Sequence, residues 1–264
     1  MRSRLGLRFA ALGYLAMLLL IPLGMVFYRT FDQGFWPAWH AVTSPDARHA
    51  LYVTLIIVAI VVPANTIFGI VCALAIARGR FPGRGVLNAL VDLPLALSPV
   101  VVGLALFLLY GRLGWFGGWL SSHGIQILFA LPGMVLATIF ISLPFVVREV
   151  VPVLREIGTE QEQAAATLGA SRLQTFWRVT LPAIRWGVAY GVVLTTARAL
   201  GEFGAVSIVS GNLIGKTQTL TLYVQNQYED FNTPGAYAAA VLLAMIAVAT
   251  LVVMTMFRRR KETA

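Results

Sequence analysis

The chain has 264 residues, of which 58% are hydrophobic and only 12% are charged. A water-soluble domain of this length cannot bury so much apolar surface, so the composition excludes an ordinary soluble fold and indicates a protein surrounded by membrane lipid. The net charge of +9 does not indicate a nucleic-acid partner, because the basic residues lie in short stretches between long apolar runs, as in membrane proteins.

Six apolar segments are long enough to cross a membrane, since a spanning helix needs about 20 residues. They predict an all-α integral membrane protein in which a single transmembrane domain covers residues 1–264. The first segment is longer than the apolar core of a signal peptide, so we interpret it as a retained span. In chain order, the predicted spans are residues 9–28, 51–77, 86–110, 131–151, 186–209 and 237–257.

The 20 Lys and Arg residues divide unequally between the two sides of the predicted spans. Fifteen belong to the two chain ends, to the connection after the second span, and to the segment around the fourth connection. Four lie in the other connections, and Arg198 lies within a span. Because cytoplasmic loops hold the excess of positive charge, we expect both termini to be cytoplasmic.

The third predicted span is irregular, because it contains Asp92, Pro94 and Pro99. Proline removes a helix hydrogen bond and kinks the axis. Such interruptions are tolerated at membrane depth only where protein or a water-filled cavity surrounds them. We therefore expect these three residues to have a structural role inside the protein, with Asp92 holding a neighbouring helix rather than contacting a transported solute.

The segment 155–185, between the fourth and fifth spans, is long and polar for so hydrophobic a chain. Thr159 with Glu162, and Ser171 with Gln174, have the spacing of capping boxes, and each pair predicts a helix start.

A break is expected between these two helices. Gly169 suits the end of the first helix, and Pro182 predicts that the second ends or bends near Leu181. Two short helices should therefore meet at an angle near Gly169 and Ala170. The local pattern suits an exposed docking surface and equally suits an amphipathic loop on the lipid headgroups.

The same segment resembles the EAA loop of permeases from binding-protein-dependent ABC importers. The pattern of that loop is Glu-Ala-Ala, three residues, Gly, nine residues, Ile, one residue and Leu-Pro. Two positions depart from it, because Gln163 replaces the Glu and Val179 replaces the Ile. The resemblance implies a type I ABC importer permease fold and a coupling helix that contacts a separate ATPase. The coupling residues it implies are Glu162, Gln163, Ala164, Ala165, Gly169, Ala170, Leu181 and Pro182.

Residues 91–104, 130–154 and 197–224 also resemble the CysW-type permease subunit of bacterial sulfate/thiosulfate importers. The resemblance implies import of sulfate, and of thiosulfate, through the bacterial cytoplasmic (inner) membrane. The implied partners are a CysT-like second permease, two CysA-like ATPases that use ATP and Mg, and a periplasmic or lipid-anchored sulfate-binding protein. This chain would then bind no cofactor and hold no catalytic residue. The GEFGA stretch at 201–205 also occurs in molybdate permeases, so molybdate or tungstate import stays an alternative.

Ionisable residues inside a membrane are costly and are therefore candidates for function. Arg198, near mid-depth, would lower the barrier for a dianion. Arg198 and Glu202 lie one helical turn apart, however, and equally suit a pair that neutralises itself. Ser207 and Ser210 suit either the outer mouth of a path or the capping of a helix end. The candidate residues of a translocation path or gate are Arg198, Gly201, Glu202, Ser207 and Ser210.

Patterns for other chemistry are absent from the sequence. Cys72 and the three scattered histidines have no metal-ligand spacing. The stretch 211–217 has three residues between its glycines, where a phosphate-binding loop has four. An intramembrane protease would need a histidine within a span or an HExxH helix, and the chain has neither. A secondary transporter that needs no ATPase stays a further alternative, although it would not require the EAA-like segment.

Overall fold

A computed structural model describes the backbone of residues 2–262, with side chains described for residues 11–250 and 252. All regular structure in this part of the chain is helical, which confirms the predicted all-α class. Within it, four helices are long and apolar enough to cross a membrane, or five if one bent pair is counted as a span. The six-span count stays a prediction. The four long helices are α1 (Arg2–Phe31), α3 (Pro45–Arg78), α7 (Leu131–Glu156) and α13 (Thr233–Glu262).

The third predicted span is divided rather than merely kinked. It consists of α4 (Arg84–Ala96) and α5 (Pro99–Tyr110), which meet at 110°. The break lies at Leu97 and Ser98, which are both extended, while Pro94 lies within α4. A proline disfavours helical geometry in the residue before it, so Pro99 forces Ser98 out of the helix and then begins α5.

The fifth predicted span, residues 186–209, is also not one helix. α10 (Leu181–Leu200) ends at Gly201, and the short α11 (Gly204–Val209) follows after a break. The carboxylate of Glu202 holds this break in place, because its Oε1 accepts a hydrogen bond from the Ala205 amide at 3.0 Å. The prediction of one continuous span missed this break, although Gly201, Glu202 and Gly204 interrupt the apolar run there.

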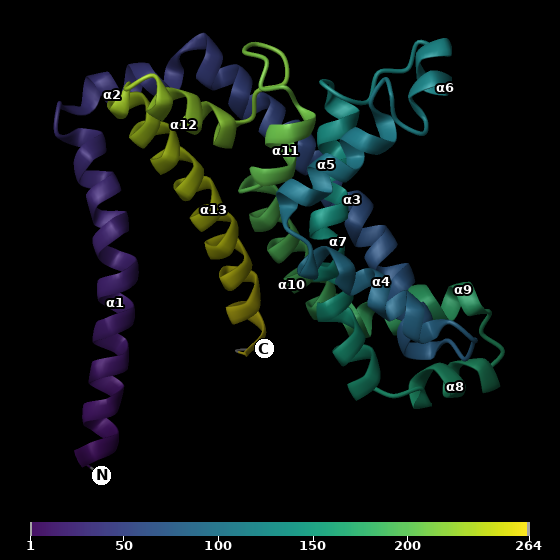
Figure 1. Cartoon of the computed structure of the whole chain (residues 1–264). Helices are drawn as coiled ribbons and strands as arrows, with labels where there is room; N and C mark the ends of the chain where they lie inside the picture. Colours follow the sequence, from purple (N-terminus) through teal and green to yellow (C-terminus); the bar gives the residue numbers. More distant parts are fainter. Residues whose placement is uncertain (1, 263–264) are drawn as a thin grey trace.

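The helices α3, α7 and α10 pack together in the centre of the molecule (Figure 1). The pair α8 (Glu160–Thr167) and α9 (Arg172–Thr175) lies at the same end of the molecule as the start of α1 (Figure 1). Three shorter helices lie at the opposite end, namely α2 (Phe35–Thr43), α6 (Gly117–Ser122) and α12 (Leu220–Glu229).

Small residues bring the central helices close together. Val146 of α7 lies between Gly69 of α3 and Gly191 of α10, with no room for a Cβ atom at either glycine. Close backbone approach of this kind is typical of helix packing in membranes. The same region buries Cys72 and a set of aliphatic side chains, among them Ile76, Val147, Val150, Leu154 and Ile184.

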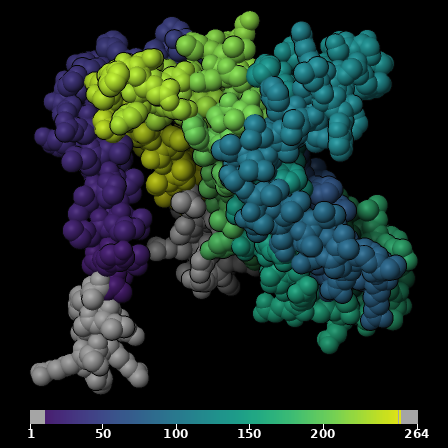
Figure 2. Space-filling model, in the orientation of Figure 1, coloured from purple at the N-terminus to yellow at the C-terminus, as the bar shows by residue number. Residues whose placement is uncertain are grey.

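The helix α1 packs differently from the central helices. It touches α2 and α13, but its side chains from Ala11 to Met25 are all exposed, and most are large and apolar. In the space-filling view α1, in purple, stands at the edge of the molecule beside the yellow segment of α13 (Figure 2). An outward apolar surface of this length suits contact with lipid or with another membrane helix, rather than with water.

Candidate functional site

The predicted elbow between two short helices is present at one end of the molecule. We call residues 159–180 the coupling elbow. Gly169 has φ 82, a left-handed conformation that favours glycine, and it ends α8. Ser171 begins α9 with a complete capping box, since its hydroxyl accepts from the Gln174 amide and the Gln174 side chain accepts from the Ser171 amide. The second predicted capping box is thereby confirmed.

The first predicted capping box is wrong in its bonds, although α8 does begin after Thr159. Thr159 makes no capping hydrogen bond, and its hydroxyl instead accepts from the Gln163 amide group at 3.0 Å. Glu162 does not reach back to the helix start. Its carboxylate binds two side chains from other parts of the chain, which a local pattern could not foresee.

Arg78, at the C-terminal end of α3, is the main partner of Glu162. Its Nε donates to Glu162 Oε2 at 3.1 Å, and its Nη2 donates to Oε1 at 3.4 Å. The same guanidinium donates to the carbonyl oxygens of Leu154 at 2.7 Å and Gly158 at 2.5 Å. On the far side, the Thr180 hydroxyl donates to Glu162 Oε1 at 3.0 Å. Sequence reasoning missed Arg78, which it counted only as a cytoplasmic charge.

The connection from the elbow into α10 also differs from the expectation. Residues Phe176–Thr180 form a π-helical turn that joins α9 to α10 without interruption. Pro182 therefore does not end the helical stretch near Leu181, but lies in the first turn of α10. A proline is tolerated there because the wider hydrogen-bond pattern of the preceding turn does not require its missing amide hydrogen.

Large apolar side chains project from the coupling elbow. Leu168, Leu173 and Trp177 are exposed to 88%, 68% and 59%. Ala164 is exposed beside them, and Ala165 is half-buried. Apolar groups that gather on an otherwise polar segment mark a surface for contact with another protein. Large apolar residues within an otherwise polar segment are the sequence signal from which this surface could have been predicted.

Arg198 and Glu202 form the expected ion pair. Arg198 Nη1 lies 2.8 Å from Glu202 Oε2, but the two are not aligned as a hydrogen bond, so the contact is an ion pair. The Glu202 side chain is almost fully buried, whereas that of Arg198 is 30% exposed. The Glu202 carbonyl oxygen accepts from the Thr221 hydroxyl at 2.8 Å. Glu202 therefore fixes the break between α10 and α11 and places a partly open guanidinium beside it.

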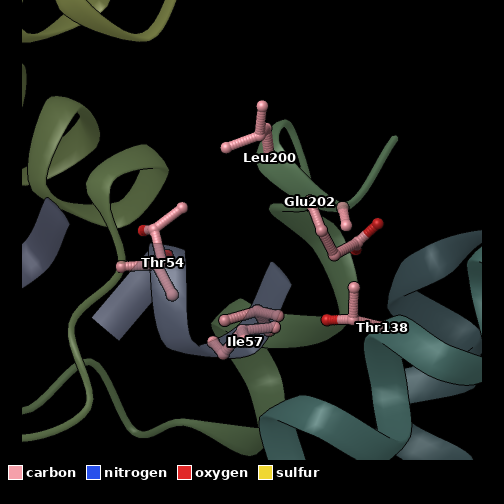
Figure 3. A pocket seen from close by; sticks show the side chains of 8 residues that line it. Thr54, Ile57, Thr138, Leu200 and Glu202 are labelled. Atoms are coloured by element: carbon pink, nitrogen blue, oxygen red, sulfur yellow. The ribbon is translucent and has the colours of Figure 1, made fainter. Parts of the chain in front are cut away.

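A small cavity lies next to this pair. Its polar lining includes Thr54 of α3, Thr138 of α7 and Glu202, and its apolar lining includes Ile57 and Leu200 (Figure 3). Its volume of about 10 Å³ has room for about one water molecule. A tetrahedral oxyanion does not fit there in this conformation.

The hydroxyl groups of the two predicted serines make only local contacts. The Ser207 hydroxyl donates to the Gly204 carbonyl oxygen at 2.8 Å, and Ser210 Oγ accepts from the Asn212 amide at 3.0 Å. Gly201 is exposed. The structure brings none of these residues to the coupling elbow.

Asp92 contacts a different helix from its own. Arg148 of α7 donates through Nε to Asp92 Oδ1 at 2.6 Å. A second contact joins Arg148 Nη2 to Asp92 Oδ2. The ion pair thus ties α4 to α7, and both side chains are partly exposed. Among the described residues, no group of His, Cys, Asp and Glu is arranged to hold a metal ion.

Residues 65–263 match the family described as "Binding-protein-dependent transport system inner membrane component". The chain is 52% identical to the "Sulfate transport system permease protein CysW" of Synechocystis, over 95% of this chain and 91% of that protein. It is 40% identical to the "Sulfate transport system permease protein CysT" of Escherichia coli, over 89% of this chain and 85% of that protein.

Solved structures share the fold at low sequence identity. A chain of a bacterial ABC transporter involved in the import of alginate has a TM-score of 0.80 and 20% identity, with coverage of 98% of this chain and 97% of that one. A second structure of a bacterial alginate ABC transporter, in complex with an alginate pentasaccharide-bound periplasmic protein, has a TM-score of 0.79. The chain thus has the fold of an ABC importer permease.

Proposed function

Because this chain belongs to the family of binding-protein-dependent transport system inner membrane components, we propose that it is the permease subunit of an ATP-driven sulfate importer. It is a multi-pass protein of the bacterial inner membrane. The identity of 52% to a sulfate permease, along nearly the whole of both chains, is the observation that supports sulfate as the substrate. Thiosulfate, a dianion of related shape, is the second substrate that we propose.

The proposed complex contains two different permeases. The chain is more similar to a CysW protein than to a CysT protein, at 52% against 40% identity, so we assign it the CysW-type position beside a CysT-like partner. A periplasmic or lipid-anchored sulfate-binding protein would deliver the anion. Two CysA-like ATPases would bind ATP and Mg and carry out hydrolysis, for which this chain supplies no group.

The coupling elbow is the proposed contact with one ATPase. Leu168, Leu173 and Trp177 offer apolar surface outside the predicted spans, where another protein can cover it. Gln163 is exposed on α8, so an uncharged side chain stands at the position where the EAA pattern has a carboxylate. We propose that closure of the two ATPases displaces the elbow and switches the permease pair between its inward-open and outward-open states.

The proposed path passes the break between α10 and α11. Arg198 is partly exposed there beside the exposed Gly201, so its guanidinium can lower the barrier for a dianion while Glu202 holds it in place. Ser207, which is partly exposed, would border the path through its backbone, since its hydroxyl is engaged locally. Ser210 is fully buried and would support the adjacent turn through its bond to the Asn212 amide. The cavity of about 10 Å³ beside Glu202 suits a closed state.

Uptake of radiolabelled sulfate by cells that lack this chain tests the proposal. We expect the deletion to abolish uptake, the gene to restore it, and excess thiosulfate but not molybdate to compete. Unchanged sulfate uptake in the deletion strain would refute the substrate. Competition by molybdate at equal concentration would move the assignment to the molybdate or tungstate class.

A further inference from the structure

Arg78 joins three helices at the point where the coupling elbow meets the transmembrane domain. It is the last residue of α3, and it donates to the carbonyl oxygens of Leu154 within α7 and Gly158 just after it. Its Nε and Nη2 also donate to the Glu162 carboxylate on α8. Both partners are partly buried, so the ion pair is less screened by water than a surface pair.

Glu162 extends the same connection to a fourth helix. Its Oε1 accepts from the hydroxyl of Thr180, a buried residue directly before α10. One carboxylate on the elbow therefore binds the end of α3 through Arg78 and the start of α10 through Thr180. Gln163, the residue at the EAA glutamate position, takes no part in this arrangement and binds Thr159, the residue before its own helix.

The backbone alone connects α8 only loosely to α7. α8 packs mainly on α9 and on the π-helical turn, and its direct connection to α7 passes through Gly158, which has φ 63. If α8 were displaced, the chain would bend at Gly158 unless a side chain held α8 against α7. The fork of the Arg78 guanidinium, which places several donors in a fixed plane, supplies that hold, and a lysine has no comparable geometry.

We infer that Arg78 is a positioning residue for transport, which ties Glu162 of the coupling elbow to the inner ends of α3 and α7 so that they move as one body. This inference rests on the proposed function. When an ATPase displaces the elbow, the link transmits the displacement to the central helices. Without the link, the elbow moves alone and ATP hydrolysis proceeds without matching transport.

The test measures sulfate transported per ATP hydrolysed, in proteoliposomes that contain the whole complex and the binding protein. We expect Arg78→Gln and Glu162→Gln to lower this ratio about fivefold or more, the lower limit of typical coupling effects between sites. Arg78→Lys should lower it as well, because one ammonium group cannot reach the carboxylate and both carbonyl oxygens. The double variant should be no worse than either single variant, since both remove the same link.

Two exposed neighbours provide matched controls. Arg80→Gln removes a cation two residues from Arg78, and Glu156→Gln removes a carboxylate six residues from Glu162 and outside the coupling elbow. Both controls should keep the wild-type ratio. A purely structural role for Arg78 would lower the amount of assembled complex, and transport and hydrolysis would then fall together with an unchanged ratio. An unchanged ratio in both Arg78→Gln and Glu162→Gln overturns the inference.

If the Arg78 variants assemble poorly, a variant of Glu162 still tests the inference. Glu162→Gln leaves the bonds from Arg78 to the two carbonyl oxygens in place, and a lowered ratio in this variant supports the link. An unchanged ratio in Glu162→Gln overturns it. The proposed function fails separately, if the wild-type complex hydrolyses ATP in the presence of the sulfate-binding protein but transports no sulfate.

Discussion

Val146 of α7 lies directly against Gly191 of α10, so that a Cβ atom added to Gly191 would come 2.7 Å from the Val146 Cα. On its other side, the Val146 Cβ would lie 2.7 Å from a Cβ added to Gly69 of α3. Non-bonded carbon atoms do not approach so closely, and the contact at Gly191 is with backbone, which cannot rotate away. The three central helices therefore depend on these glycines for their spacing.

Gly191→Ala should destabilise the protein, although alanine favours a helix over glycine by about 1 kcal/mol. Overpacking costs roughly 1–3 kcal/mol, so we expect a net loss of up to about 2 kcal/mol and a lower unfolding temperature of the purified complex. Gly85→Ala is the matched control, because a Cβ at that position meets no atom within 4 Å. A Gly191→Ala protein as stable as the control would contradict the packing described for α7 and α10.

Substitution of Gly169 should separate ATP hydrolysis from uptake. A β-branched residue such as valine is strained at its φ of 82, by roughly 1–2 kcal/mol, and would open the turn between α8 and α9. We expect Gly169→Val to accumulate in the membrane and to hydrolyse ATP, with strongly reduced sulfate uptake. Gly169→Asn should retain uptake, since asparagine tolerates the left-handed conformation. Normal uptake by Gly169→Val would remove the reason for assigning a coupling role to the elbow.

The two interpretations of Arg198 predict different double variants. Arg198→Gln leaves the buried Glu202 carboxylate without its cation, a change that costs roughly 3–5 kcal/mol for a buried pair. Arg198→Gln with Glu202→Gln removes both charges, while the new amide oxygen can still accept from the Ala205 amide. If Arg198 acts on the permeating anion, as we propose, the double variant should assemble normally and remain inactive in uptake. Restored uptake in the double variant would show that the residues only neutralise each other.

The ion pair between Asp92 and Arg148 should behave as a structural tie between α4 and α7. Asp92→Asn leaves an uncompensated guanidinium at this contact, so we expect less protein in the membrane fraction, measured by quantitative immunoblotting. Asp92→Asn combined with Arg148→Gln should recover much of the loss, because neither charge is then left alone. If the double variant is no better than the single one, the contact is not a tie of this kind.

Sequence reasoning succeeded where the determining interactions are local. The Ser171 capping box, the left-handed Gly169 and the apolar helices all follow from patterns within a few residues. It failed at Glu162, where a partner 84 residues away takes the carboxylate from its local role. Arg78 looked like any cation at the end of a span, because neither its fork of bonds nor its partners leave a trace in nearby sequence.

The two divided spans show the same limit. Pro99 correctly predicted an irregularity in the third span, but a proline does not determine whether a helix is only kinked or is divided with a bend of 110°. The break after Gly201 depends on the Glu202 carboxylate bound to the Ala205 amide, a hydrogen bond that the sequence pattern did not predict. The size of a bend follows from tertiary packing, which a single sequence does not display.

The π-helical turn at Phe176–Thr180 has a consequence for insertions and deletions in this segment. Each π turn holds about one residue more than an α-helical turn and arises as a one-residue bulge within a helix. Deletion of one residue there would restore regular winding and rotate α9 against α10 by about 100°. Thr180 would then face away from Glu162. The direction in which the elbow points around the α10 axis therefore depends on the one extra residue in this turn.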